Sequence, residues 1–284
     1  MSKLVWDAAT THYYQTGCKH GVLYKQDNSG AYPAGVAWNG LTAVTVSPEG
    51  ADATEIYADD IKYLTLRSAE NIKATIEALY SPPEFDECDG SVELAAGMKI
   101  AQQARKAFGF AWETVKGNDA QLNDYGRILH ILYGCTVAPS EKSYQTINDS
   151  PEVMNLSWEI DTVPAAVTGH KPTAYVEIDL TALSPAQVTA VENALFGADA
   201  QEATAATYKK ATGTYQATGV DYYTRSGEGT TQSPYVYTKD DTPSSEEFNT
   251  YYVVDTPAHD AQTASSPYLP LPDALAGIIT AAAA

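Results

Sequence analysis

The stretch NGLTAVTVSPEGADATEIYADDIKYLTLRSAE, residues 39–70, joins two runs in which polar and apolar residues alternate. Alternation with a period of two is typical of a β-strand with one buried face. Residues 35–46 are therefore predicted to form a strand with a kink at Asn39-Gly40, a dipeptide common in turns and bulges. Residues 62–67 are predicted to form a second half-buried strand. The acidic connection between them, residues 47–60, is predicted to be a loop without a buried face of its own.

The same alternation recurs along the chain. Further strands are predicted at residues 72–78, 127–139, 153–163 and 174–183. Five carboxylates alternate with apolar partners in these strands, so each is predicted to oppose the apolar face of its own strand. They are Glu77, Glu159, Asp161, Glu177 and Asp179.

One helix is well marked within SPAQVTAVENALFG, residues 184–197. Ser184 is predicted to cap it, Pro185 to occupy its first turn, Gln187 to complete a capping box and Gly197 to end it. A second, short helix is predicted at residues 272–279. The fold class is therefore predicted to be mainly β with a flanking helix.

The composition excludes some functions. The 284 residues include 17 Lys and Arg against 36 Asp and Glu, for a formal charge of −19. Binding of nucleic acid through phosphate neutralisation is therefore disfavoured. Three cysteines without a C-x-x-C pair indicate buried thiols rather than disulfides or a zinc site. The sequence shows no signal peptide and no apolar run of roughly 18 residues, so we expect a cytoplasmic product without membrane binding.

The composition changes near Asp199. Residues 200–266 are rich in Thr, Ser, Ala, Gly and Tyr, with turn signals between the tyrosine-containing runs. Short hairpins with exposed tyrosines are predicted there, since disordered segments are poorer in aromatic residues. The chain is thus divided into a β domain at 1–199, an insertion at 200–266 and a returning segment at 267–284.

No residue pattern indicates catalysis, a cofactor or a metal. His12, Cys18 and His20 lie close together but match no familiar ligand spacing. An acidic cluster lacks the residue order of an EF-hand and is predicted to be a solvated loop. Carboxylate pairs abound in so acidic a chain, so counting them neither supports nor excludes a glycosidase. The acidic cluster is Glu84, Asp86, Glu87, Asp89 and Glu93, and the four tryptophans, predicted to be core or interface residues, are Trp6, Trp38, Trp112 and Trp158.

Several runs in collinear order resemble the major tail protein, or tail tube protein, of long-tailed bacteriophages. They cover most of residues 1–199 and resume near Pro267, whereas residues 200–266 depart from the pattern and look like an insertion. The runs are WDA…TG…HGVLY (6–24), GVAWNGLTAV…SPEGAD…IYADDIKYLTLRSAE (35–70), EFDECDGS (84–91), YGCTVAPSEKSYQTINDSPE (133–152) and LPLPDALAGII (269–279).

The resemblance implies a structural, non-enzymatic virion protein with a β-sandwich or half-barrel fold. In that family, subunits form hexameric rings that stack into a tube, and their inner sheets join into a β-barrel through which DNA passes. The implied partners are other copies of the chain, the tape measure protein, the tail terminator, tail-tip proteins and transiting DNA that is not bound specifically. The implied location is the virion tail, with host cytoplasm during assembly.

The resemblance also gives roles to particular residues. The five strand carboxylates become candidates for the wall of the bore, where negative charge would keep DNA from adhering. Residues 47–60 and the segment around 6–24 become candidates for contacts between stacked rings. The candidates for those contacts are Trp6, Tyr24, Glu49, Asp52, Glu55 and Tyr57.

Two other functions stay open from the sequence. A tube protein of a contractile injection system would share the ring but contact a sheath. A monomeric β-sandwich adhesin would use the tyrosine-rich residues 200–266 as a binding surface. We expect that segment to be a β-rich projection on the outer surface of a tube.

Overall fold

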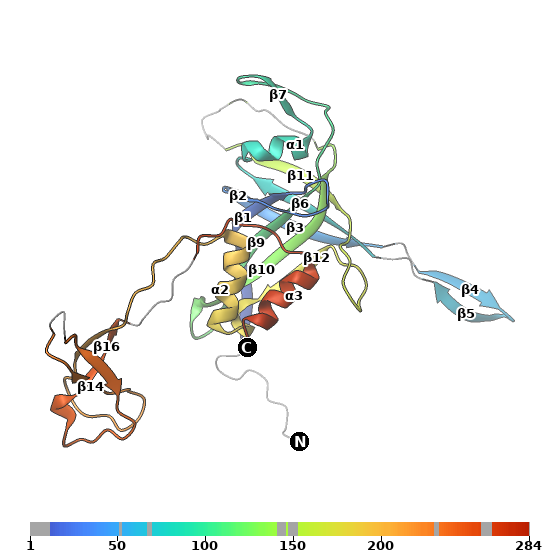
Figure 1. Ribbon diagram of the computed structural model, residues 1–284. Helices are drawn as coiled ribbons and strands as arrows, with labels where there is room; N and C mark the ends of the chain where they lie inside the picture. Colours follow the sequence, from blue (N-terminus) through green and yellow to red (C-terminus); the bar gives the residue numbers. More distant parts are fainter. Residues whose placement is uncertain are drawn as a thin grey trace. The chain divides into compact units, whose positions relative to one another are not determined.

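The computed structural model describes residues 12–50, 53–66, 70–140, 146, 153–229, 233–256 and 263–283 (Figure 1). The chain divides into two compact units. Unit 1 comprises Met1–Gly197 and Ser266–Ala284, and unit 2 comprises Ala198–Ser265. The boundaries expected from composition lie within two residues of these. Among the described residues, no helix is both long and apolar enough to cross a membrane.

Unit 1 is built on one antiparallel sheet of eight strands. One strand, β12 (Tyr175–Asp179), pairs with the middle of β10 (Leu122–Val137), next to the end of β10 that pairs with β11 (Leu156–Thr162). The prediction of a mainly β fold is confirmed, and the described strands form no closed barrel. The other seven strands run, in spatial order, β2 (Gly35–Trp38), β1 (Tyr13–Lys25), β9 (Phe108–Asn118), β10 (Leu122–Val137), β11 (Leu156–Thr162), β6 (Asn71–Ala78) and β3 (Leu41–Glu49).

The sheet curls because its two edge strands are joined by only two residues. β2 ends at Trp38 and β3 begins at Leu41, yet these strands lie at opposite edges of the sheet. Gly40 makes the connection with a φ of 80°, a conformation that glycine adopts without strain. The prediction of one kinked strand over residues 35–46 is therefore wrong: Asn39-Gly40 separates two strands and brings the edges of the sheet together.

Aromatic side chains fill the concave side of the curled sheet. Trp38 lies with its ring centroid 4.5 Å from that of Phe85, 5.5 Å from Phe110 and 5.4 Å from Trp158. Such tilted and edge-on pairs suit the charge distribution of aromatic rings. Buried apolar residues from β6, β9, β10 and β11 complete this cluster, which we call the aromatic core. The prediction that Trp38, Trp112 and Trp158 are core residues is confirmed, whereas Trp6 lies outside the described residues.

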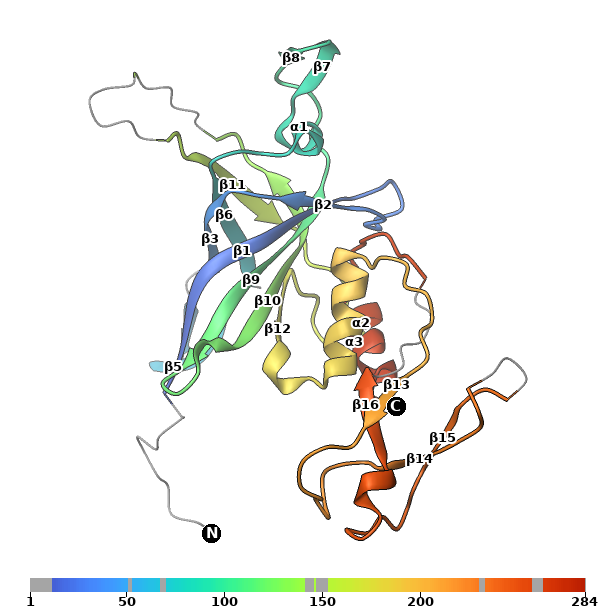
Figure 2. The same cartoon turned by 90° about the vertical axis from the view of Figure 1, so that its left-hand side faces the viewer.

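Two helices cover the other face of β1, β9 and β10. Helices α2 (Pro185–Phe196) and α3 (Pro272–Ala281) lie side by side against this part of the sheet (Figure 2). Val191 and Leu195 of α2 are fully buried there with Leu275 of α3. The predicted capping box is confirmed, because Ser184 and Gln187 each accept a hydrogen bond from the backbone N–H of the other. This second buried layer is called the helix core.

Two hairpins in unit 1 pair only with themselves among the described strands. One is β4 (Thr54–Ala58) with β5 (Ile61–Leu66), and the other is β7 (Val92–Ala95) with β8 (Met98–Ile100). The prediction of a loop over residues 47–60 is therefore wrong for the described part of that range, which holds the end of β3 and, from Thr54, one arm of a hairpin. Its turn, Asp59-Asp60, has positive φ angles of 51° and 61°, which suit a tight two-residue connection.

The acidic cluster is better paired than its sequence indicates. It is not a loop as predicted: Glu84 lies in a 3₁₀ turn (Pro83–Phe85), the next three acidic residues lie in the helix α1 (Asp86–Asp89), and Glu93 lies in β7. Glu87 lies 2.7 Å from Lys106, and this hydrogen bond lowers the pKa of the Glu87 carboxyl. The neighbouring Cys88 is a free, buried thiol whose pKa burial raises to about 12. The cluster thus anchors one end of the aromatic core.

Unit 2 is a separate sheet of four short strands. Their order is β13 (Thr207–Lys210), β16 (Tyr252–Thr256), β14 (Tyr223–Ser226) and β15 (Val236–Lys239), and a short turn at Phe248–Thr250 precedes β16. Tyr222, Phe248 and Tyr251 form a small buried core on one side. Of the predicted short hairpins, β14–β15 is present, whereas β13 and β16 pair although they are far apart in the sequence. Tyr222 and Tyr251 are buried rather than exposed.

Candidate functional site

Three of the five strand carboxylates share one surface. Cross-strand pairing places Glu77 of β6 opposite Ser157, Thr75 opposite Glu159, and Lys73 opposite Asp161. Their side chains point away from the aromatic core, because Ala74, Ile76, Trp158 and Ile160 occupy the alternate positions. The surface continues onto β3 with Thr45, Ser47 and Glu49. We call these outward side chains of β3, β6 and β11 the acidic face.

The acidic face carries four carboxylates and one lysine among the described residues. Lys73 lies 3.1 Å from Glu49 and 3.9 Å from Asp161, and its hydrogen bond to Glu49 raises the pKa of the Lys73 ammonium. Asn155 donates a 2.7 Å hydrogen bond to Glu77. Glu159 is exposed and, among the described residues, forms no ion pair. The surface is thus polar, solvated and negatively charged.

Glu177 and Asp179 lie on the opposite side of the sheet. β12 pairs with β10 so that Glu177 is opposite His130 and Asp179 opposite Ile128. Val176 and Ile178 of β12 pack into the helix core, so the alternate residues turn toward the aromatic side. There Asp179 forms an ion pair with Lys116. The five bore candidates therefore do not share one face of the sheet, because the apolar side of β12 is the reverse of that of β6 and β11.

The β4–β5 hairpin exposes a group of large apolar side chains. Tyr57, Ile61 and Tyr63 are 65%, 62% and 66% exposed. The strand predicted at residues 62–67 is present as β5, but it is exposed rather than half-buried, because among the described residues the hairpin pairs with no other strand. Its polar residues bond to one another, since Glu55 accepts hydrogen bonds from Lys62 and Tyr57, which lower the pKa of its carboxyl. An exposed apolar group of this size is typical of an interaction surface.

The candidates for contacts between rings fall in different places. Glu55 and Tyr57 lie on the exposed hairpin, and Glu49 lies at the end of β3. Trp6 and Asp52 lie outside the described residues. Tyr24 does not suit such a contact, because it is fully buried in the helix core and donates a 2.6 Å hydrogen bond to the carbonyl of Leu195.

The sheet leaves two lengths of strand edge unpaired among the described residues. β3 pairs with β6 on one side only, over Leu41–Glu49. β2 covers only residues 21–24 of β1, so residues 13–20 have β9 on one side and no strand on the other. Free backbone N–H and C=O groups along an edge are a template for pairing with another chain.

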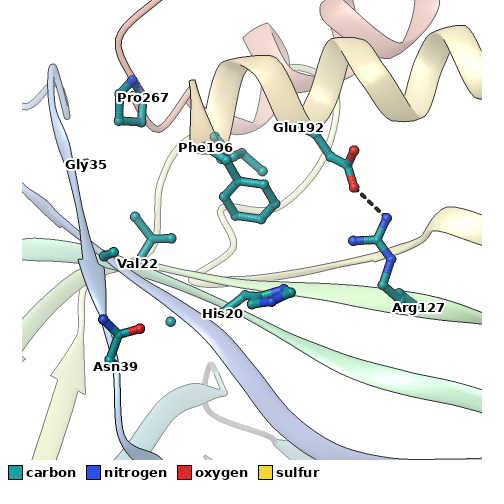
Figure 3. Close-up of a pocket in the computed structure, with 11 residues that line it drawn as sticks. His20, Val22, Gly35, Asn39, Arg127, Glu192, Phe196 and Pro267 are labelled. Carbon is teal, nitrogen blue, oxygen red and sulfur yellow. Dashed lines mark hydrogen bonds and ion pairs between the residues drawn. The ribbon is translucent and has the colours of Figure 1, made fainter. Parts of the chain in front are cut away.

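A cavity of about 490 Å³ lies between β1, β2 and the end of α2 (Figure 3). Behind it, the fully buried carboxylate of Glu113 lies 2.8 Å from His20 and 2.9 Å from Arg127. Arg127 also forms a 2.6 Å ion pair with Glu192 of α2. The positions of these four residues in the sequence give no sign that they lie together in the structure. The network ties α2 to β9 and β10, so we assign it to holding the helix on the sheet rather than to binding a ligand.

His130 is buried at the open end of the aromatic core. Its ring lies nearly parallel to those of Trp112 and Tyr175, with ring centroids 5.1 Å and 6.0 Å away, and these two rings also contact each other at 6.3 Å. Its Nε2 lies 2.8 Å from the hydroxyl of Thr114, and its Nδ1 lies 2.6 Å from that of Tyr175. Burial lowers the pKa of His130, and the carboxylate of Glu177, 3.7 Å away, opposes this shift.

The lowered pKa predicts a pH dependence of stability. The unfolded chain protonates His130 near the ordinary pKa of about 6.5, whereas the native state resists the proton. Native stability should therefore fall as the pH drops through that value and level off below the native pKa. When the pH is lowered from about 7.5 to about 5.5, the urea concentration at the midpoint of unfolding should fall less for His130→Gln than for the wild type. Equal losses in the two proteins would contradict this expectation.

A layered β architecture serves many unrelated functions, so the fold alone assigns none. The surfaces that the chain offers are the acidic face, the apolar hairpin and the open strand edges. The sequence matches no protein-family model and no curated protein.

Proposed function

We propose that this protein is the subunit of a tube built from stacked rings, the tail tube of a long-tailed bacteriophage. The observation that carries the proposal is the β4–β5 hairpin, which pairs with no further strand in the described part of the chain and exposes Tyr57, Ile61 and Tyr63. Burying one such side chain stabilises an association by about 1.5–3 kcal/mol. A hairpin with several of them is suited to docking on the next copy of the chain, which supports contact between rings.

The open edges support closure within a ring. Pairing the free edge of β3 with the free edge of residues 13–20 in a neighbouring copy would satisfy both rows of backbone groups. Each copy carries both edges, so the contact is head-to-tail, and repetition around an axis closes it into a ring. The sheets of the ring would then join into one barrel.

In such a ring the acidic face is the surface suited to a bore that conducts DNA. Glu77, Glu159 and Asp161 would face the phosphates, and the lysine of this face, Lys73, already lies beside two carboxylates, Glu49 and Asp161. Such a net negative wall repels phosphates rather than binding them. Glu177 and Asp179 are not proposed for the bore, since they lie on the other side of the sheet.

Reversing charge on the acidic face should make assembled tubes retain DNA. In a Glu159→Lys, Asp161→Lys variant, each lysine offers a phosphate a partner, so DNA should co-sediment with tubes and dissociate as salt is raised. Glu177→Lys is a matched control on the opposite side of the sheet and should leave DNA in the supernatant. DNA retention by the control alone, or by neither variant, would contradict the assignment of the bore.

Electron microscopy of the purified protein tests the proposal itself. Tubes or rings of uniform diameter are expected at high protein concentration. A preparation that stays monomeric at all concentrations and ionic strengths would reject the tube and favour the adhesin.

A further inference from the structure

One face of the unit 2 sheet carries five tyrosines and three cations. Pairing places Tyr223 of β14 beside both Tyr252 and Lys239, and Arg225 opposite Tyr237. On β13, Lys210 is opposite Tyr252, and Tyr208 lies two residues away on the same side. Tyr235, directly before β15, adds a ring that is 46% exposed. We call this set the tyrosine face.

The rings on this face form a continuous row. Tyr208 stacks on Tyr237 with ring centroids 4.1 Å apart and an angle of 12°, and lies 4.9 Å from Tyr223. Tyr237 lies 5.3 Å from Tyr252. The guanidinium of Arg225 then lies 4.8 Å from the centre of Tyr252 and 4.2 Å from that of Tyr235. Stacking against two rings holds the guanidinium in a fixed orientation.

The row is not required to fill the core of unit 2. That core lies on the other side and consists of Ala211, Tyr222, Phe248 and Tyr251. The tyrosines of the row are instead half-buried or exposed. A second aromatic layer on the open side of so small a sheet is typical of a contact surface.

Among the described residues, two of the three cations on the tyrosine face lack the acidic partner that the other lysines of β13 and β15 have. Lys209, whose side chain points to the core side, forms a 2.8 Å ion pair with Asp255, and Lys239 forms one with Asp221 at 2.8 Å. Lys210 and Arg225 form no ion pair with any described residue. In a chain with a formal charge of −19, two uncompensated cations beside a row of tyrosines indicate an anionic ligand.

We propose that the tyrosine face binds a short acidic saccharide, one whose sugar rings bear carboxylate or phosphate groups. The apolar face of a sugar ring fits against tyrosine rings, whose hydroxyls remain free for its polar groups. The planar guanidinium of Arg225 can pair with an oxyanion through two parallel hydrogen bonds. This binding site is independent of the proposed tube, because it involves residues of unit 2 alone.

A nucleic acid fits the same face less well. Binding of a polyanion depends on several phosphate contacts, and only two cations here are uncompensated. The other charges of the chain, predominantly negative, repel a long polyanion. A saccharide with one acidic group per sugar needs only the contacts that Lys210 and Arg225 offer.

Isothermal titration of the full-length protein with trigalacturonate and with glucose 6-phosphate tests the site. The wild type should bind at least one of these probes, and Arg225→Gln should weaken that binding at least roughly tenfold. Arg225→Lys keeps the positive charge but cannot form two parallel hydrogen bonds to one oxyanion. Its affinity should therefore lie between those of the wild type and Arg225→Gln. Lys209→Gln is the matched control, adjacent to Lys210 but on the opposite side, and should bind as the wild type does.

Four outcomes would overturn the proposal. They are the binding of neither probe, equal weakening by Lys209→Gln and Arg225→Gln, equal affinity for neutral galactotriose, and tighter binding of an oligothymidylate. Circular dichroism of each variant establishes that the loss of binding is not a loss of folding. Whether the protein forms tubes has no bearing on any of these four results.

Discussion

A variant with Tyr57→Thr, Ile61→Thr and Tyr63→Thr should remain a folded monomer and fail to form tubes. Threonine favours strands, so the β4–β5 hairpin should persist while its apolar surface is lost. If each of the three side chains stabilises the contact between rings by about 1.5–3 kcal/mol, the variant needs at least about a thousandfold more protein to assemble. Sedimentation and electron microscopy over a range of concentrations measure this change.

The β7–β8 hairpin offers a matched control. It too pairs with no other described strand and exposes Val92, Leu94 and Met98. The corresponding threonine variant should assemble like the wild type if the contact belongs to the β4–β5 hairpin specifically. Normal tubes from the β4–β5 variant would remove the main support for the proposed ring contacts, and loss of tubes in both variants would point to general destabilisation.

Truncation of Trp38 should have the largest effect on folding. Its ring contacts Phe85, Phe110 and Trp158, and its indole N–H donates a 2.8 Å hydrogen bond to the carbonyl of Tyr80. Trp38→Ala should lower the free energy of unfolding by about 3–5 kcal/mol, through lost burial and the cavity left behind.

Two further variants show which contacts of Trp38 account for the loss of stability. Trp38→Phe keeps a ring in the aromatic core and should lose less stability. Tyr80→Ala keeps the backbone carbonyl that accepts the hydrogen bond and removes only an exposed ring, so its effect should stay within about 0.5 kcal/mol. Urea denaturation measures all three variants, and a loss below about 1 kcal/mol in Trp38→Ala would show that the core repacks around the missing ring.

Local signals in the sequence predicted local structure well. The helix at Ser184–Gly197 was predictable because its cap, first-turn proline and closing glycine all act within one segment. The strand at Asn71–Ala78 was predictable because alternation reports one buried face.

Relations between strands could not be predicted in the same way. Alternation shows that the side chain of Glu177 lies on the face of β12 opposite to Val176 and Ile178. It does not show on which side of the sheet those two apolar side chains lie. The sheet has a core on each side, and the apolar side chains of β11 face one core while those of β12 face the other. Residues 62–67 have the alternation of a half-buried strand, yet no other part of the described chain covers the β4–β5 hairpin to which the described residues of this strand belong. Their cover, in our proposal, is another copy, which one sequence does not contain.

The ends of unit 2 meet. Ala198 and Ser265 exchange two backbone hydrogen bonds, of 3.0 Å and 2.9 Å, directly beside the points where the chain leaves and re-enters unit 1. Unit 2 contains 68 residues, Ala198–Ser265. Because its ends are adjacent, its presence should cost the folding of unit 1 little more conformational entropy than a tight turn at the same place. The junction is therefore a natural place for gain, loss or exchange of whole modules. A different folded domain with neighbouring termini could be spliced there and displayed on every copy without altering the sheet that carries it.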